Sequence, residues 1–168
     1  AFAQRPGLLL ADTKLDLVVD PAGFLDRITD LWDPTASFGQ IPNQAVGYWF
    51  PMGPFFWVGE RVGLPAWVIQ RLWIAALLVV AFWGMLRVLE ALPVGRPNGR
   101  IVGALTYALS PILLAQVAYR SGGLLPTAFL PLALAPLITG SRQGSPRRAA
   151  ALSAVAVRVA GEKLRRFA

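Results

Sequence analysis

The stretch LWIAALLVVAFWGML, residues 72–86, decides the fold because it carries no charged side chain. Two further stretches, residues 101–119 and 124–140, are equally free of charge. A helix that crosses a bilayer needs about 20 mostly apolar residues, with a range of roughly 17–25. The second and third stretches reach this length, and the first reaches it with its flanks. Three such segments in 168 residues would leave too little polar surface for a soluble protein, so we expect them in a membrane.

The overall composition favours the same class of protein. Hydrophobic residues make up 55% of the chain and charged residues only 15%, whereas a soluble domain is about one-quarter charged. The mean hydropathy is +0.54. The net charge of +7 is of a kind often found in nucleic-acid-binding proteins, but here the basic residues cluster beside apolar segments. A soluble nucleic-acid-binding protein is therefore the least favoured class, and we expect no nucleic-acid partner.

The absence of two residue types restricts the chemistry. The chain has no Cys, which excludes disulfides and thiolate metal sites. It has no His, so the commonest zinc ligand and the commonest general base are both missing. Acid–base chemistry would use Asp, Glu, Lys or Tyr, and no phosphate-binding loop, dinucleotide fingerprint or metal-ligand spacing appears. We expect no bound cofactor and no metal site, although a need for a divalent metal in the reaction stays open.

The charge pattern divides the chain into four parts. We expect the end of a truncated first transmembrane helix, an extracytoplasmic loop, three transmembrane helices, and a cytoplasmic basic turn followed by an incomplete further helix. The start without Met predicts a missing upstream segment, and the basic end predicts a truncation, an altered reading frame or an amphipathic tail. The truncated first helix is residues 1–11 and the extracytoplasmic loop is residues 12–64. The three transmembrane helices lie in residues 65–140, at about 65–92, 101–119 and 124–140, and the basic turn with the incomplete helix is residues 141–168.

Prolines predict local features of the helices. Asp20-Pro21 is typical of a helix start, and the apolar residues after it recur at helical spacing. This amphipathic helix would lie flat on the membrane or pack on another domain, and both remain open. Pro111 predicts a kink in the second span. Three further prolines predict that the third span is broken and packed inside a bundle, since each removes a backbone hydrogen bond. The apolar residues are Phe24, Leu25, Ile28, Leu31 and Trp32, and the prolines are Pro126, Pro131 and Pro136.

The distribution of charge predicts the orientation. The loop 12–64 holds seven acidic residues against three basic ones, whereas the turns 93–100 and 141–148 are basic. Basic loops of membrane proteins stay in the cytoplasm, so we expect both turns inside and the acidic loop outside. The chain is thus predicted to be a multi-pass protein of the plasma membrane, and chemistry in the polar loop would occur on the extracytoplasmic side.

The first candidate site is Asp12, Lys14 and Asp16, directly after an apolar run. A carboxylate where the chain leaves the membrane is partly desolvated, which suits a general base. The carboxylates could also bind a cation or pair with Lys14. A last alternative is an ordinary helix exit, whose charges only mark the water boundary.

Two other groups of residues could bind a ligand. Amide and aromatic side chains suit sugar hydroxyls and sugar faces, but the residues alone favour a plain Pro/Gly-rich connecting loop. Arg71 and Arg120 lie at the outer ends of spans, where a guanidinium could bind a lipid phosphate or simply extend to the headgroups. With Lys14, the residues expected to bind substrate are Gln40, Asn43, Gln44, Tyr48, Arg71 and Arg120.

Five segments carry a resemblance to a known family. Spread over roughly residues 5–157, they resemble the N-terminal part of the arabinofuranosyltransferase D family of mycobacteria and related actinobacteria. The resemblance implies a GT-C glycosyltransferase, which is an all-α, polytopic transmembrane helical bundle with an extracytoplasmic first loop carrying interfacial helices. The segments are DTKLDL (12–17), DPAGFLDRITDLWD (20–33), FGQIPNQAVGYWFPMGPFF (38–56), LPAWVIQRLW (64–73) and RSGGLLPTAFLPLALAPL (120–137).

The resemblance also implies an activity. It implies transfer of arabinofuranose from a polyprenyl-phosphate donor to the arabinan of arabinogalactan or lipoarabinomannan, with membrane lipid, sugar donor and arabinan acceptor as partners. An acidic residue just after the first span commonly acts as the base in such enzymes; Asp12 matches it, with Asp16 as runner-up. Family members are far longer, so this fragment alone is expected to be inactive. The alternative is a non-catalytic membrane scaffold or transporter subunit. A cavity in the middle of the membrane would favour transport.

Overall fold

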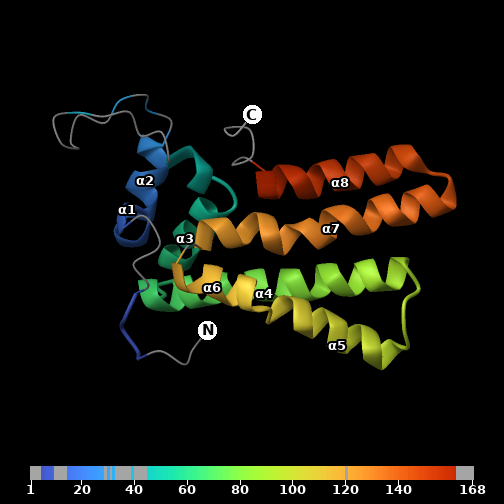
Figure 1. Ribbon diagram of the computed structural model, residues 1–168. Helices are drawn as coiled ribbons and strands as arrows, with labels where there is room; N and C mark the ends of the chain where they lie inside the picture. Colours follow the sequence, from blue (N-terminus) through green and yellow to red (C-terminus); the bar gives the residue numbers. More distant parts are fainter. Residues whose placement is uncertain are drawn as a thin grey trace. The chain divides into compact units, whose positions relative to one another are not determined.

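The computed structural model describes residues 5–9, 15–28, 30, 32, 39, 45–119 and 121–161 (Figure 1). Within these ranges the secondary structure is helical and contains no strand. The chain forms two compact units, unit 1 (Ala1–Trp73) and unit 2 (Ile74–Ala168). The expected all-α fold is therefore confirmed.

The second helix of unit 1 has a capped start, as the Asp20-Pro21 dipeptide predicts. The side chain of Asp20 accepts a hydrogen bond of 2.9 Å from the backbone N–H of Gly23, and Pro21 occupies the first turn. The helix ends at Arg27, so the prediction that it continues to Trp32 is wrong, and Trp32 is 55% exposed. The helical elements of unit 1 are α1 (Leu15–Val19), α2 (Pro21–Arg27), η1 (Ala45–Tyr48), α3 (Met52–Arg61) and the start of α4 (Ala66–Ala91).

The polar loop contains a small apolar core of its own. Helices α1, α2 and α3 contact one another. Their buried side chains include Leu17, Phe24, Met52 and Phe56, and Ile28, directly after α2, is buried as well.

Gly63 ends α3 with a positive φ of 79°, and the N–H of Leu64 bonds back to the carbonyl of Gly59 at 3.0 Å. This left-handed glycine cap stops α3, so the chain turns before α4 begins.

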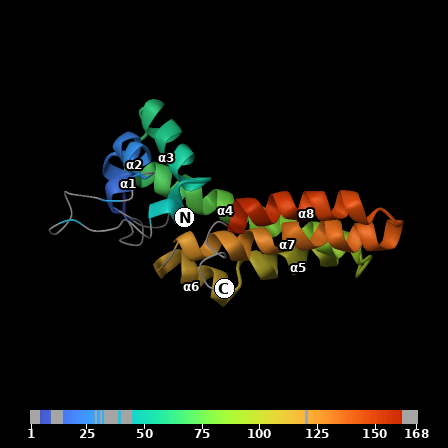
Figure 2. The same ribbon diagram turned by 90° about the horizontal axis from the view of Figure 1, so that it is seen from above.

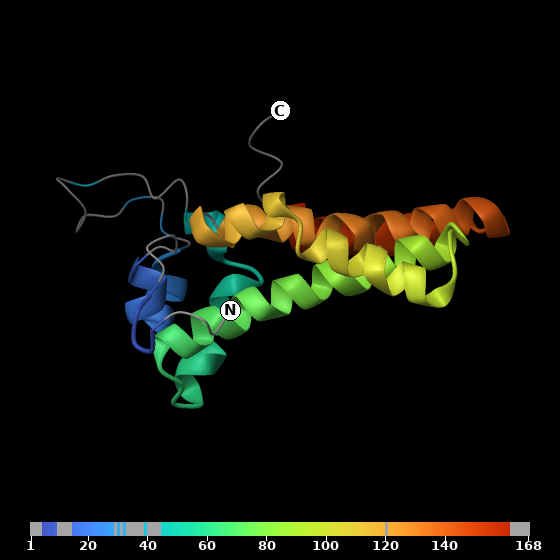
Figure 3. The ribbon, with the colours of Figure 1, turned by 60° about the horizontal axis from the view of Figure 1, so that its bottom comes forward.

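Unit 2 contains the long apolar helices. It holds the rest of α4, then α5 (Pro97–Ala108), α6 (Pro111–Tyr119), α7 (Ser121–Gln143) and α8 (Pro146–Gly161). By length and composition, α4 and α7 can each cross a membrane, and α5 with α6 would be a third span. Helices α5 and α6 are bent by 42° at their break (Figure 3), which confirms the kink expected at Pro111.

The third apolar stretch is one continuous helix, so the prediction that it is broken is wrong. Pro131 has no N–H and leaves the carbonyl of Thr127 without its usual helical donor. The hydroxyl of Tyr107, on α5, donates to that same carbonyl at 2.8 Å. A neighbouring helix thus replaces a missing backbone hydrogen bond. Residues 121–123, which lie between the predicted spans 101–119 and 124–140, form the start of α7.

Helices α7 and α8 lie side by side and antiparallel in unit 2 (Figures 1 and 2). The buried hydroxyl of Ser153 on α8 donates to the carbonyl of Ala133 on α7 at 2.8 Å. Helix α4 approaches α7 at Gly84, where a Cβ atom would lie 3.0 Å from the backbone nitrogen of Leu132.

The two basic turns, between α4 and α5 and between α7 and α8, lie at the same end of unit 2 (Figure 1). Arg142 Nη1 donates to the carbonyl of Ala91 at 2.9 Å, which joins the ends of α7 and α4. The positive charge of both turns is therefore gathered at one end of the bundle.

Candidate functional site

Asp16 is the predicted carboxylate that the structure describes. It lies in the first turn of α1 and is exposed, whereas the next two residues, Leu17 and Val18, are buried. The short helix is held by these two apolar side chains, so its carboxylate faces outward and is accessible to a substrate. Asp12 and Lys14 lie outside the described residues.

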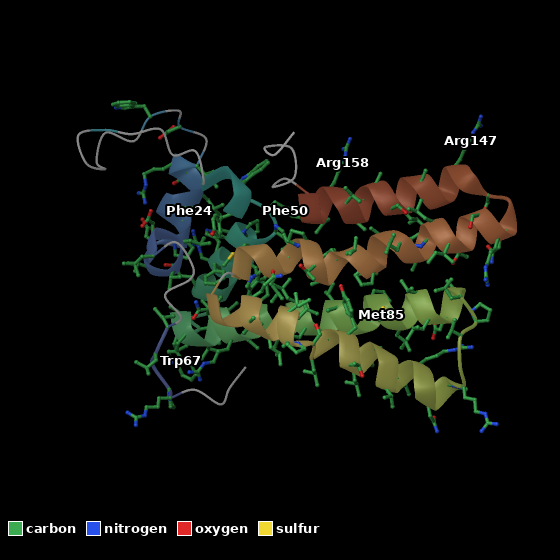
Figure 4. The ribbon with its side chains drawn as sticks, viewed as in Figure 1. Phe24, Phe50, Trp67, Met85, Arg147 and Arg158 are labelled. Carbon is green, nitrogen blue, oxygen red and sulfur yellow. The ribbon has the colours of Figure 1, made fainter. Side chains whose placement is uncertain are left out.

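Arg71 occupies an unusual position in unit 1. It lies near the start of α4 and is only 4% exposed. Its Nη2 donates to the carbonyl of Arg5 at 2.7 Å, and its guanidinium carbon lies 4.6 Å from the ring centroid of Trp67, which Figure 4 labels. A side chain that extends to the headgroups would be exposed, and this one is enclosed by protein. Phosphate binding by Arg71 stays a prediction.

Gln70 joins Arg71 as a second buried polar side chain, and sequence reasoning missed it. Gln70 is 2% exposed and interacts with other parts of the chain. An amide within the otherwise apolar run around residues 66–73 was the available signal. Two adjacent buried polar residues at the start of an apolar helix are costly unless they have partners, so this position has a role in structure or function.

Helix α3 positions the start of α4. A Cβ atom at Gly59 would lie 2.8 Å from a side-chain carbon of Ile69, so only glycine allows this close approach. The rings of Phe55 and Trp73 lie 5.2 Å apart, within the range of favourable aromatic pairs. These contacts fix the first turns of α4 and, with them, the direction of Arg71.

An aromatic surface follows η1. Tyr48 is half-buried and interacts with other parts of the chain, whereas Trp49 and Phe50 are about half exposed. Trp57 on α3 is also exposed, and Arg61 lies over its ring at 5.1 Å. Aromatic side chains of this kind offer flat apolar faces to sugars or to lipid headgroups. Of the other residues expected to bind substrate, Gln40, Asn43, Gln44 and Arg120 lie outside the described residues.

Metal-binding residues do not gather in the described ranges. Among these residues no group of three His, Cys, Asp or Glu side chains could hold a metal ion. The exposed acidic side chains of unit 1 that the structure describes include Asp16, Asp20, Asp26 and Glu60.

The sequence of this helical scaffold matches a known family along nearly its whole length. A sequence model described as alpha-(1->3)-arabinofuranosyltransferase, N-terminal GT-C domain, matches residues 1–162. The chain belongs to this arabinofuranosyltransferase family. The match includes both the polar helices of unit 1 and the apolar helices of unit 2, and it confirms the resemblance seen in the five segments.

Two curated relatives support the assignment. The alpha-(1->3)-arabinofuranosyltransferase of Mycobacterium tuberculosis is 51% identical over 155 residues, which cover 92% of this chain and 11% of the relative. That of Mycolicibacterium smegmatis is 49% identical over 161 residues, covering 95% of this chain and 11% of the relative. The chain therefore spans about one-ninth of the length of these arabinofuranosyltransferases.

Solved structures of the family have the same fold. A cryo-EM structure of the arabinofuranosyltransferase AftD from mycobacteria matches with a TM-score of 0.87 and 50% identity, over 94% of this chain and 12% of that chain. A mutant form of AftD matches equally well, over 96% of this chain and 13% of that chain. Together with its apolar helices, this likeness identifies the chain as a membrane protein.

Proposed function

We propose that this chain forms part of a multi-pass glycosyltransferase of the plasma membrane. It transfers arabinofuranose from a polyprenyl-phosphate donor to the arabinan of the cell wall, with its active face outside the cell. The observation that carries this proposal is the family match over residues 1–162, and the name of the relatives supports an alpha-(1->3) linkage. The gathering of both basic turns at one end of unit 2 supports the orientation, because basic loops favour the cytoplasm.

The reaction needs a base near the point where the chain leaves the membrane. Asp12 takes the proton of an acceptor hydroxyl as its oxygen attacks the anomeric carbon of the donor. The bond between that carbon and the phosphate oxygen breaks, and the lipid phosphate leaves with the electron pair. Asp16, which is exposed on α1, is the runner-up for this role.

The leaving phosphate gains negative charge, which a nearby cation stabilises. Arg71 is suited to this because it is buried and held by Arg5 and Trp67, and a charge in surroundings of low dielectric acts more strongly than one in water. Arg120 is the second candidate. The sugar hydroxyls would bind Lys14, Gln40, Asn43, Gln44 and Tyr48.

The base is tested by substitution in the whole protein. Membranes carrying Asp12→Asn, Asp16→Asn or the control Glu60→Gln are incubated with a synthetic polyprenyl-phosphate arabinofuranose and an arabinan oligosaccharide, and the product is quantified. Glu60 is a matched control because it is an exposed carboxylate of the same unit, on α3. We expect Asp12→Asn to reduce the rate by about 10²–10⁴-fold and the other two to stay within a few-fold. A loss confined to Asp16→Asn would move the role to Asp16, and full activity of both aspartate variants would refute a base in this segment.

A transporter subunit is the second candidate function, because the break between α5 and α6 brings polar groups together within apolar helices. Tyr107 bonds to the carbonyl of Thr127, and the amide of Gln116 lies 3.5 Å from the Thr127 hydroxyl. Transporters place discontinuous helices at their substrate sites. Uptake of labelled arabinose or lipid-linked sugar into proteoliposomes would favour this alternative, whereas product formation without uptake would favour glycosyl transfer.

A further inference from the structure

A cavity of about 850 Å³ opens in unit 2 among α4, α7 and α8, near the two basic turns. Its size lies within the range of ligand sites, roughly 300–1,000 Å³. The wall formed by α7 changes character along the helix. It begins with Leu132, Ala135 and Pro136 and continues with Thr139 and Arg142. One end of the cavity is therefore apolar and the other is polar and charged.

The length of this gradient matches one leaflet of a bilayer. Leu132 and Arg142 are ten residues apart on α7, a rise of about 15 Å. The hydrocarbon core of a bilayer is about 30 Å thick, so one leaflet is about half of that. On α4, the charged side chains Arg87 and Glu90 also line the cavity and lie in the last turns of the helix. The charges of both helices thus meet at the end of the bundle that carries the basic turns.

The two arginines that line the cavity suit a phosphate. Arg87 lies over the ring of Trp83 at 5.3 Å and 3.6 Å from a carboxylate oxygen of Glu90. Arg142 donates one bond to the carbonyl of Ala91, and a guanidinium has several further N–H donors. Both side chains are exposed, so their remaining donors are accessible. Capping of the α4 carboxyl terminus would explain Arg142 alone, but it explains neither Arg87 nor the apolar part of the wall.

The surroundings add to the positive charge. Arg96, Arg100 and Arg147 are basic residues of the two turns or of the helix starts beside them, at the same end of unit 2 (Figure 1). Basic pockets between transmembrane helices attract anionic lipid headgroups. Glu90 is the one acidic residue that lines the cavity in the described part of the chain, and it opposes anion binding.

We propose that this cavity binds an anionic phospholipid from the leaflet beside the basic turns. Arg87 and Arg142 bind the phosphate, and one acyl chain lies along the wall formed by Leu132, Ala135 and Pro136. None of the residues proposed for glycosyl transfer lines this cavity, and the lipid site does not depend on the proposed reaction.

Native mass spectrometry of the intact protein in mild detergent tests the site. The protein is titrated with phosphatidylglycerol or phosphatidylcholine of identical acyl chains, and bound lipid is counted. Because phosphatidylcholine also has a phosphate, the arginines distinguish the two lipids by net charge. We expect Arg87→Gln and Arg142→Gln each to weaken the preference for phosphatidylglycerol by about tenfold, since each removes a positive charge beside the anionic headgroup. Glu90→Gln is expected to strengthen it, since this change removes the opposing carboxylate.

Arg147→Gln is the matched control. Arg147 is an exposed arginine of the same basic end that does not line the cavity, and its side chain points away from α7 (Figure 4). We expect its effect to stay within about twofold, because it is not a phosphate ligand. An equal loss in Arg147→Gln and Arg142→Gln would overturn the proposal, since the preference would then reflect overall surface charge.

A further variant tests the acyl chain. Ala135→Phe fills the apolar part of the cavity while keeping both arginines, so we expect it to reduce binding of phosphatidylglycerol as strongly as Arg142→Gln. Inorganic phosphate is expected not to displace the lipid, because it lacks the acyl chain. Displacement by phosphate would refute the role of the acyl chain. If the unchanged protein showed no preference for phosphatidylglycerol, another segment or no lipid would fill the cavity, and the proposal would be overturned. The arginine variants, at exposed positions, keep the test valid if Ala135→Phe fails to fold.

Discussion

The contribution of the Tyr107 hydroxyl to stability can be measured by a double-mutant cycle. The hydroxyl donates to the carbonyl of Thr127 at 2.8 Å, and that carbonyl lacks a helical donor because Pro131 has no N–H. Tyr107→Phe removes the hydroxyl and keeps the ring, so it leaves this carbonyl unsatisfied between two apolar helices. Pro131→Ala instead supplies a backbone N–H and restores the helical donor.

The loss of stability expected for Tyr107→Phe follows from the surroundings of the Thr127 carbonyl. An unsatisfied buried carbonyl costs about 1–3 kcal/mol, whereas side-chain hydrogen bonds in membrane proteins average about 0.6 kcal/mol. Because this acceptor has no backbone partner, we expect Tyr107→Phe to reduce the free energy of unfolding by about 1 kcal/mol. In the Pro131→Ala background the cost should fall to less than half of that, which gives a coupling energy of at least about 0.5 kcal/mol.

The free energy of unfolding can be measured by titrating the detergent-solubilised protein with sodium dodecyl sulfate and following tryptophan fluorescence. Thr106→Val is the control, because the Thr106 hydroxyl donates to the carbonyl of Val102, which already accepts the helical bond from residue 106. Its loss should change stability by less than about 0.3 kcal/mol. An equal cost of Tyr107→Phe with Pro131 and with Ala at that position would refute the reasoning, since the hydroxyl would then not replace the missing donor.

Three other substitutions have expected outcomes in the same unfolding assay or by hydrogen exchange. Gly84→Ala should destabilise unit 2 by about 1–3 kcal/mol, because the new Cβ would lie 3.0 Å from the backbone nitrogen of Leu132. Gly99→Ala has open space around it and should be neutral or stabilise by up to about 1 kcal/mol; equal losses in both variants would contradict the packing argument. Asp20→Ala should cost about 1 kcal/mol and speed hydrogen exchange at the Gly23 amide, and unchanged exchange there would show that the cap contributes nothing.

Local signals in the sequence predict the features that local geometry determines. The Asp20-Pro21 dipeptide predicts the start of α2, and Pro111 predicts the bend between α5 and α6, because cap and ring act on neighbouring backbone. The continuity of α7 could not be predicted in this way. Its missing donor is replaced by Tyr107, which lies twenty residues before Thr127 and reaches it only in the folded bundle.

In the candidate site, too, contacts between residues far apart in the sequence could not be predicted. The position of Asp16 after an apolar run predicts a partly desolvated carboxylate, whereas the structure has Asp16 exposed in the first turn of α1, and its role as a base stays a prediction. The burial of Arg71 depends on the carbonyl of Arg5, sixty-six residues away, and no spacing rule reveals such a contact. For Asp12, the proposed role as a base rests on the resemblance to the family.

The antiparallel pairing of α7 and α8 has a consequence for hydration. With α7 across the bilayer, α8 starts at the same interface and carries Arg158 twelve residues along, at a depth of about 18 Å. That depth is beyond the middle of a hydrocarbon layer of about 30 Å, and Arg158 is exposed and points away from α7 (Figure 4). A guanidinium at such a depth draws in water and phosphate and thins the membrane beside it. With α8 facing lipid at that depth, we expect the bilayer beside it to be wetter and thinner than the bilayer around α4.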